Sequence, residues 1–480
     1  MVQRRSALIA GAISSLFFLL LVFRPPAPTA TPRNVQLQSQ LVQRLINGEA
    51  LTLGILGGSI SRQEGGYGAQ VVDWLNRNWP SKEGAHSLVN GAVAASESSL
   101  ASVCFDTLLQ QDGSSPNLNL IIVEYSYNDA ASPETARSAF EAITRQALLR
   151  NSAVFSLEFA GYSHNRGHME IGKATNDFQN SVGTLHADVA SLYSVPIVDV
   201  ARYFYAFADA ERLMNYTDGI HPNLEGHGLV ATLVVEELIR LVASTEESAQ
   251  WFLSKSISVN GPSWLHPPPP TPPSDNARSL PSLPSPFYRS SASSVSAELS
   301  PLPPPSFSST SPSSDIIKWS CTISQISSTV SALRQSAIEM QGFLYGHDES
   351  DGGPFRSRAR PGFRTNSTMG EGDDEEGHLI FALGRSADVK SVALLYRRSW
   401  QASGKAVVWV DQERETGRGR SRSGGCEREV DGQWEAETTQ MVLEVVCEEG
   451  AVEWREEGEL FLHVVARRRD YFKVYGYAKG

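Results

Sequence analysis

Short apolar runs alternate with helical patterns along residues 48–245, and this alternation constrains the fold more than any other feature. The apolar runs lie at residues 51–56, 87–89, 118–123, 153–157 and 196–200. The helical patterns lie at residues 35–46, 67–79, 133–150, 178–193 and 224–243. A helix between two strands returns the chain to the edge of the sheet where it started, so such strands run parallel. The sequence therefore predicts an α/β domain with a doubly wound parallel sheet.

The chain is too long for one domain, since it has 480 residues with 41% hydrophobic content. Residues 262–314 are rich in proline and serine and cannot bury enough apolar surface to order themselves. We therefore expect four parts: an amino-terminal anchor and stem (1–34), the α/β domain (35–261), a disordered linker (262–314) and a β-rich domain (315–480).

The carboxyl-terminal part has a different sequence pattern. Its apolar and aromatic runs lie at residues 392–396, 406–410, 441–446, 460–465 and 471–477, separated by glycine, serine or charged residues. Such runs predict strands, and several of them in succession predict a β-sandwich. The acidic run 373–376 and the basic residues Arg418, Arg420 and Arg422 are interpreted as solvated loops.

The charge balance excludes one class of partner. The chain has 41 basic and 53 acidic residues, which gives a net charge of −12. Nucleic acids and anionic membrane surfaces attract basic proteins, so neither is expected as the main partner.

Residues 7–23 carry no charge and are preceded by Arg4 and Arg5. This length can just span a bilayer, and the basic residues favour a cytoplasmic amino terminus. We therefore expect a single-pass type II membrane protein of the Golgi or secretory lumen or the cell surface. A cleaved signal peptide, and hence a secreted protein, is the alternative. Asn215 and Asn366 begin two glycosylation motifs that are compatible with either route.

Two short motifs carry groups suited to nucleophilic catalysis. Gly57-Gly58-Ser59 follows the first apolar run, which would place Ser59 at the carboxyl end of a strand, where ligands bind in α/β sheets. Asp218-Gly219-Ile220-His221-Pro222 precedes the last helix and holds a carboxylate and an imidazole in one tight loop. Two further motifs, Asn90-Gly91 and Tyr127-Asn128-Asp129, each follow a predicted strand.

In their order and spacing, these four motifs resemble the four sequence blocks of the SGNH (GDSL-type) hydrolases, which have a flavodoxin-like fold. The resemblance covers residues 48–245. The chain departs from the family pattern at two positions, with Gly58 in place of an aspartate and Ser126 in place of a glycine. Neither change removes a catalytic group, but both leave the substrate preference open.

The resemblance assigns a role to each motif residue. Ser59 would be the nucleophile, His221 its general base, and Asp218 the group that orients His221. The N–H groups of Ser59 and Gly91 and the amide of Asn128 would form the oxyanion hole, where one donor lowers the barrier by about 3 kcal/mol. No cofactor or metal is required. The alternatives are structural: Asn128 and Asp129 as helix caps, Gly91 as a turn, and His221 as a surface residue.

Other polar residues support weaker hypotheses. His164 and His168 have the spacing of metal ligands, but no cysteine or carboxylate completes a set on the same segment. Asp177 is expected to be a surface or capping group, and His227 a residue of the helix start. Tyr125 and Tyr127 could contact a substrate or pack beside the strand end.

A second resemblance concerns the carboxyl-terminal part. Trp319, Cys321, the pair Gly342-Phe343 and the segment 360–363 are similar to the corresponding region of algal membrane-anchored SGNH proteins. The domain would then be a glycan-binding module or a structural appendage. The four cysteines, Cys104, Cys321, Cys426 and Cys447, allow three pairings, and Cys426 and Cys447 flank a predicted hairpin that a disulfide could close.

Together, these observations predict a serine esterase that acts through an acyl-enzyme, with an O-acetylated carbohydrate as the preferred substrate. A glycan O-acetyltransferase that uses the same three residues is one alternative. The other is a catalytically silent glycan-binding protein.

Overall fold

The computed structural model describes most of the first domain and the strands of the second. The described residues are 33–110, 114–129, 133–159, 182–200, 221–244, 320–323, 327–341, 343–346, 362–365, 376–399, 404–412, 426–433, 439–448, 451, 458–467 and 472–480. Among them, no helix combines the length and the apolar composition that crossing a membrane requires.

Several of the sequence predictions lie outside the described residues. They concern the anchor at 7–23, the linker at 262–314, Asp218, the glycosylation candidates Asn215 and Asn366, and His164, His168, Asp177, Arg418, Arg420 and Arg422. These assignments, like the domain boundaries, stay predictions.

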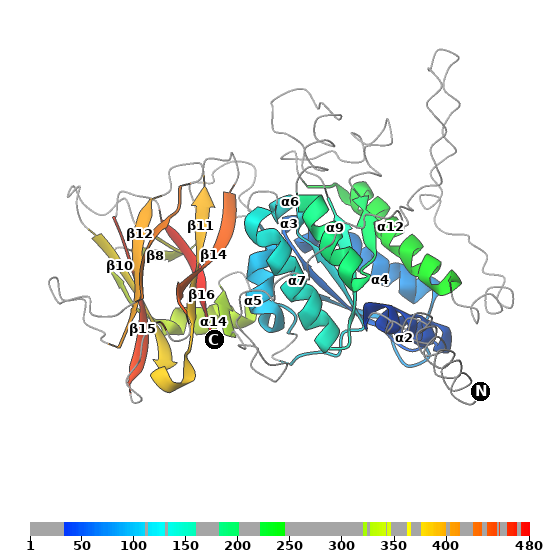
Figure 1. Ribbon diagram of the computed structural model, residues 1–480, viewed down its shortest axis with the longest axis horizontal. Coiled ribbons are helices and arrows are strands. Elements are labelled where there is room, and N and C mark those ends of the chain that lie inside the picture. Colours follow the sequence, from blue (N-terminus) through cyan, green and yellow to red (C-terminus); the bar gives the residue numbers. More distant parts are fainter. Residues whose placement is uncertain are drawn as a thin grey trace, which may run out of the picture.

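The first domain is built on a five-stranded parallel sheet with the order β2-β1-β3-β4-β5 (Figure 1). Its strands are β1 (Thr52–Gly57), β2 (Ser87–Asn90), β3 (Leu120–Glu124), β4 (Ala153–Glu158) and β5 (Ile197–Asp199). All neighbouring pairs run parallel, which confirms the predicted doubly wound sheet. Strand β2 lies on one side of β1, and the later strands lie on the other side. In α/β folds, ligands bind at the carboxyl ends of the strands where the chain changes side in this way, here between β1 and β3.

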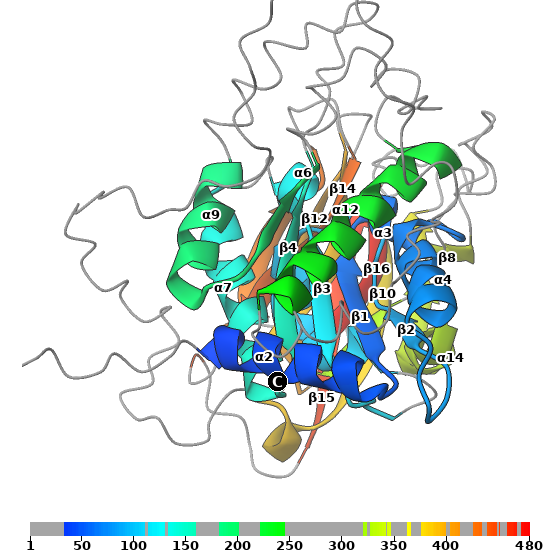
Figure 2. The same cartoon turned by 90° about the vertical axis from the view of Figure 1, so that its right-hand side faces the viewer.

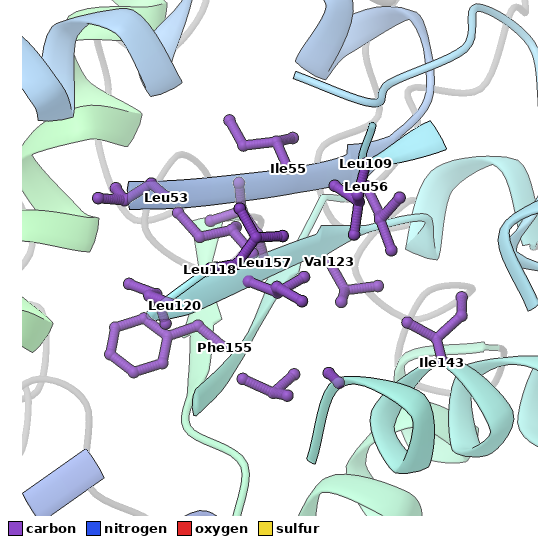
Figure 3. Close-up of a cluster of buried hydrophobic side chains, with 14 of the residues drawn as sticks. Leu53, Ile55, Leu56, Leu109, Leu118, Leu120, Val123, Ile143, Phe155 and Leu157 are labelled. Atoms are coloured by element: carbon purple, nitrogen blue, oxygen red, sulfur yellow. The ribbon is translucent and has the colours of Figure 1, made fainter. Parts of the chain in front are cut away.

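The central strands are apolar along their whole length because both of their faces are covered. Leu53, Ile55 and Leu120 are fully buried, and Figure 3 shows them packed with side chains from β4 and from the flanking helices. This continuous burial is why the runs in the sequence lack the alternation of a half-exposed strand.

Helices cover both faces of this sheet (Figure 2). They are α2 (Arg33–Asn47), α4 (Tyr67–Asn78), α5 (Ser98–Leu108), α7 (Pro133–Leu149), α9 (Val182–Tyr193) and α12 (Leu224–Ala243). Helices α5, α7 and α9 pack together on one face, and α4 and α12 pack together on the other. All except α5 were predicted. The side chain of Asn223 caps α12 by accepting a hydrogen bond from the Gly226 N–H at 2.8 Å.

The second domain consists of two antiparallel sheets, which confirms the predicted β-sandwich. One has the order β13-β12-β15-β10-β7; the other has the order β14-β11-β16-β9-β8, with β6 also paired to β16. The strands are β6 (Ser320–Ile323), β7 (Ala337–Gln341), β8 (Phe343–Gly346), β9 (Gly362–Thr365), β10 (Glu376–Arg385), β11 (Val392–Ser399), β12 (Lys405–Asp411), β13 (Glu427–Asp431), β14 (Thr439–Cys447), β15 (Glu459–Arg467) and β16 (Lys473–Lys479), with one helix, α14 (Ser327–Ser336).

The sequence did not reveal β6 to β10 or β13. Strand β10 contains the continuous apolar run 379–383, a strand signal that the sequence analysis did not use. Strand β13 is an edge strand made almost entirely of charged residues, so it carries no hydrophobic signal. Glu376, which was assigned to a solvated loop, begins β10.

The sheet that contains β11 is buried on both faces. Val392, Leu394 and Tyr396 belong to the core between the two sheets, whereas Ala393 and Leu395 belong to a cluster shared with the first domain. Side chains alternate between the faces of a strand, so one strand contributes to both contacts. The two domains therefore share a continuous apolar interface.

All four cysteines are paired. A disulfide joins Cys104 of α5 to Cys321 of β6, so it links the two domains across 217 residues of sequence. The second disulfide joins Cys426 to Cys447. The hairpin predicted between these cysteines is wrong, because β13 pairs with β12 in one sheet and β14 pairs with β11 in the other, so this disulfide links the two sheets. The sequence left three pairing schemes open. The structure has the scheme with one disulfide between the domains and one within the second domain.

Candidate active site

Ser59 is the first residue of a short helix, α3 (Ser59–Arg62), which follows β1 directly. A side chain at Gly57 would lie 2.4 Å from the Ser61 Oγ and 2.9 Å from the Glu124 carbonyl oxygen, so only glycine allows this turn. Ser59 is half-buried at the carboxyl edge of the sheet, as predicted. As the first helical residue, its N–H has no acceptor within the helix and is available to a ligand.

His221 lies beside Ser59, although 162 residues separate them in the sequence. The Nε2 atom of His221 is 2.6 Å from the Oγ atom of Ser59. His221 comes directly before α12, which is packed against α4 and so fixes the position of the loop. An imidazole at this distance can accept the hydroxyl proton, which is the contact that a serine nucleophile requires.

The start of α12 is held by a second histidine, His227. Its Nδ1 accepts from the Tyr67 N–H at 3.3 Å, and its Nε2 donates to Gln63 Oε1 at 3.0 Å. Burial, with a smaller contribution from nearby His221, lowers the pKa of His227 to about 4, so the ring is neutral. We call Gln63, Tyr67, His221 and His227 the base side of the site.

Asn128 lies on the other side of Ser59, in the short helix α6 (Ser126–Asp129) that follows β3. Gly57 pairs with Glu124 at the ends of β1 and β3, so the segments that carry Ser59 and Asn128 leave the sheet side by side. The Asn128 amide donates to the backbone carbonyl of Ser96. A Cβ at Gly58 would lie 2.8 Å from the Asn128 Nδ2, which places this amide against the turn before Ser59.

A buried network of charged groups supports Asn128. The neighbouring Asp129 accepts from the Ser98 N–H at 2.8 Å and lies 3.0 Å from His186 Nε2, while His186 Nδ1 lies 3.1 Å from Glu158. Burial alone would lower the pKa of His186, but the two carboxylates raise it to about 10, so the ring is an imidazolium. We call Ser96, Asn128, Asp129, Glu158 and His186 the oxyanion side.

Glu124 lies beneath the nucleophile and is almost completely buried. It accepts from Ser61 Oγ at 2.9 Å and from the Gly58 N–H at 3.3 Å. Burial raises the pKa of Glu124 to about 8, so at neutral pH the carboxyl group is mostly protonated. It braces the turn before Ser59 without placing a full negative charge there.

Gly91 and Ala95 lie in the loop that leaves β2. The Gly91 N–H donates to the Ile55 carbonyl at 2.9 Å, so its predicted role in the oxyanion hole would require it to leave the β1–β2 pairing. Ala95 has a φ of +59°, and no hydrogen bond of its N–H occurs among the described residues. The Ala95 N–H is therefore a candidate donor that the sequence analysis missed, because an alanine gives no signal for this conformation.

The remaining predicted residues have simpler positions. Tyr125 is buried in the core, in agreement with the packing alternative, and Tyr127 is half-buried against it. His227 lies in the first turn of α12, as expected. Within the described ranges, no group of three or more His, Cys, Asp or Glu side chains is placed to hold a metal ion. The orienting acid Asp218 is outside those ranges.

Comparison with known proteins agrees with this geometry. The model of the GDSL-like lipase/acylhydrolase family matches residues 55–229, which include Ser59, Asn128 and His221. From this match and from the contact between Ser59 and His221, we conclude that the protein is a serine hydrolase that acts on ester bonds.

Two solved structures extend the comparison. A two-domain esterase active on acetylated mannans is 16% identical, with a TM-score of 0.50, over 92% of this chain and 94% of that chain. An acetylxylan esterase from Geobacillus stearothermophilus is 14% identical, with a TM-score of 0.31, over 40% of this chain and 95% of that chain. The first has a similar fold over both domains of this chain. Among curated proteins, no match to this sequence was found. The narrower resemblance to algal membrane-anchored proteins stays a prediction.

Proposed function

We propose that the protein is a carbohydrate esterase that removes acetyl groups from an O-acetylated polysaccharide. The observation that carries this proposal is the 2.6 Å contact between His221 Nε2 and Ser59 Oγ at the carboxyl edge of the sheet. The substrate class is supported by the esterase active on acetylated mannans, which has a similar fold over both domains.

The geometry suits acyl transfer in two steps. Ser59 Oγ attacks the acetyl carbonyl while His221 Nε2 takes its proton, and negative charge forms on the carbonyl oxygen. The Ser59 N–H, the Asn128 amide and an N–H of the β2–α5 loop, from Gly91 or Ala95, are the donors for that charge. The imidazolium returns its proton to the departing sugar oxygen. Water then repeats the sequence, which releases acetate and restores the Ser59 hydroxyl.

Asp218 completes this proposal. It lies three residues before His221 in the sequence, and a carboxylate on His221 Nδ1 would hold the ring in the tautomer that leaves Nε2 free to accept a proton. Asp218→Asn should therefore reduce kcat strongly while leaving the free energy of unfolding nearly unchanged.

The test is acetate release from acetylated mannan, acetylated xylan and a short nitrophenyl ester by the full chain. Ser59→Ala and His221→Ala should abolish release, and both should unfold at the wild-type temperature. Ser39→Ala is the matched control, because Ser39 is exposed on α2, away from this edge. Release by Ser59→Ala at the wild-type rate would disprove the proposal. Transfer of acetyl to an added sugar in preference to water would instead establish the acetyltransferase.

We also propose that residues 7–23 anchor the protein in a membrane with the esterase on the lumenal or outer side. The supports are the uncharged run and the preceding Arg4 and Arg5. The full chain should resist extraction from membranes at alkaline pH, whereas a chain without residues 1–31 should be released. An amino terminus cut near residue 30 would establish a secreted protein. A loss of mass on treatment with an endoglycosidase, absent in Asn215→Gln or Asn366→Gln, would identify the glycosylated residue.

A further inference from the structure

Strand β14 makes a backbone contact with the catalytic domain. The Met441 N–H donates to the Ala95 carbonyl at 2.8 Å, and Met441 forms a parallel bridge with Ser96. Strand β14 lies at the edge of its sheet, with β11 on its other side. The edge that would otherwise face solvent therefore pairs with the loop between β2 and α5, and Figure 1 shows β14 beside α5.

The loop that Met441 holds leads directly to the oxyanion side. Ala95 has the left-handed φ of +59°, a conformation that is unfavourable for alanine and so needs support from its surroundings. The next carbonyl, that of Ser96, accepts from the Asn128 amide. Two residues further, the Ser98 N–H donates to Asp129 at 2.8 Å. Any movement of residues 95–98 would therefore displace Asn128.

The far end of the same segment is fixed as well. Helix α5 follows the loop, and its Cys104 is disulfide-bonded to Cys321 of β6. The Cys321 N–H also donates to Thr107 Oγ1 at 3.3 Å. The Met441 side chain is fully buried in the cluster shared by the two domains. The second domain thus holds this segment at both ends, with a backbone hydrogen bond at the loop and a covalent bond at the helix.

We infer that Met441 is a positioning residue for the reaction. Its backbone N–H holds the Ala95 carbonyl and so fixes the loop that determines the position of the Asn128 amide. One N–H of that amide is directed at Ser96, which orients the other for the oxyanion. The β-domain then contributes to turnover itself, besides any contribution to stability or polysaccharide binding. This inference rests on the proposed function, because it assigns to the contact a part in that reaction.

The test removes one N–H and leaves the rest of the strand intact. Met441→Pro deletes the donor, and proline is tolerated at an edge strand where the N–H points away from the sheet. Met441→Ala is the first control, since it loses the same buried side chain but keeps the N–H. Leu443→Pro is the second: hydrogen-bonding directions alternate along a strand, so the Leu443 N–H points to the same edge as that of Met441. It meets no acceptor among the described residues.

With a nitrophenyl acetate, Met441→Pro should lower kcat by on the order of tenfold with little change in KM, because a misplaced donor weakens only the transition state. Met441→Ala and Leu443→Pro should keep kcat within about twofold of wild type. In an Asn128→Ala background, Met441→Pro should lower kcat by a smaller factor than it does in the wild type, because only a donor of the β2–α5 loop is then left to displace. Equal kcat values for Met441→Pro and both controls, or full additivity with Asn128→Ala, would overturn the inference while leaving the esterase proposal intact. An inactive wild type would overturn the proposed function first.

A measurement on the unaltered chain covers the case in which Met441→Pro does not fold. A phosphonate ester attached to Ser59 places an oxygen in the oxyanion site, and coupling between two sites is reciprocal. Amide hydrogen exchange at Met441 should therefore slow on phosphonylation, while exchange at Leu443 stays the same. Unchanged exchange at Met441 would contradict the inference.

Discussion

The base side and the oxyanion side of the site are both anchored by a buried histidine, but the two histidines are in opposite charge states. On the base side, His227 is neutral, and burial lowers its pKa to about 4. On the oxyanion side, His186 faces Asp129 and Glu158, which raise its pKa to about 10 against the opposing effect of burial. The neutral ring meets an amide and a backbone N–H, and the charged ring meets two carboxylates.

This difference matches what each side has to do. The base side must leave His221 free to exchange a proton, so the ring that supports it carries no charge to disturb that exchange. The oxyanion side must hold an amide rigidly, and buried charged groups joined by hydrogen bonds fix the geometry of their neighbours. The loss of one member of such a network is strongly destabilising, because it leaves a buried charge without its partner.

The largest effect is expected from the charged histidine. His186→Leu leaves Asp129 and Glu158 buried without a cation, so it should lower the free energy of unfolding by about 3–5 kcal/mol. His227→Leu is the matched variant on the base side. It removes two neutral hydrogen bonds and should cost about 1–3 kcal/mol. Urea unfolding monitored by circular dichroism measures both, and a larger loss for His227→Leu would reverse the comparison.

The next effect is on rate. Asn128→Ala removes a donor that meets charge only in the transition state, so kcat should fall by about a hundredfold while KM stays nearly fixed. A helix cap would behave differently, because its loss costs about 1 kcal/mol of stability without a selective loss of rate. Kinetics and thermal unfolding on the same variant separate the two roles, and a less stable protein with unchanged turnover would rule out the oxyanion assignment.

The pH dependence of stability should show both histidines. Because the pKa of His227 is lower in the folded chain than the ordinary value near 6.5, its contribution is complete above pH 6.5 and is lost as the pH falls toward 4. The loss is on the order of 3 kcal/mol. The pKa of His186 is raised, so its contribution is complete below pH 6.5 and is lost as the pH rises through about 10.

A variant of His227 tests the acid part of this dependence. His227→Gln should flatten the acid limb of a plot of unfolding free energy against pH and leave the alkaline limb unchanged. An acid limb that persists in His227→Gln would show that His227 is not buried in its neutral form.

The smallest effect is expected beneath the nucleophile. The carboxyl group of Glu124 is mostly protonated at neutral pH because burial raises its pKa to about 8. Glu124→Gln replaces it with a neutral group of the same shape, so the barrier to turnover at pH 6 and the free energy of unfolding at about pH 4, where the carboxyl group is mostly protonated in both states, should change by less than about 1 kcal/mol. Its raised pKa also means that wild-type stability declines as the pH rises from about 4.5, where the unfolded chain loses this proton, to about 8, and the glutamine variant should lack that decline. A large defect of Glu124→Gln at pH 6 would show that the carboxylate is ionised.

The sequence could predict the first domain because its strands are buried on both faces and its helices have strong start and stop signals. Ser59, Asn128 and His221 were found because each stands at the end of a strand or the start of a helix. Ser59 and Asn128 follow the adjacent parallel strands β1 and β3, so the sheet brings them together, whereas the position of His221 depends on the packing of α12 against α4.

The supporting groups could not be found in this way. His186 contacts Glu158 through Nδ1 and Asp129 through Nε2, and these contacts depend on how α9 packs beside β4 and α6. A glutamate at the carboxyl end of an apolar strand, as at Glu124 and Glu158, was the one available signal. The pairing of Cys104 with Cys321 was equally hidden, because it depends on how the two domains dock.

The most direct test of the account is to identify the acyl-enzyme. Full chain mixed with acetylated mannan and quenched rapidly in acid should yield, by peptide mass spectrometry, one acetyl group on the peptide that contains Ser59. His221→Ala, which lacks the base, should not accumulate it. An acetyl group on another residue, or acetate release by the wild-type chain with no acetylated peptide under any quench condition, would contradict the account.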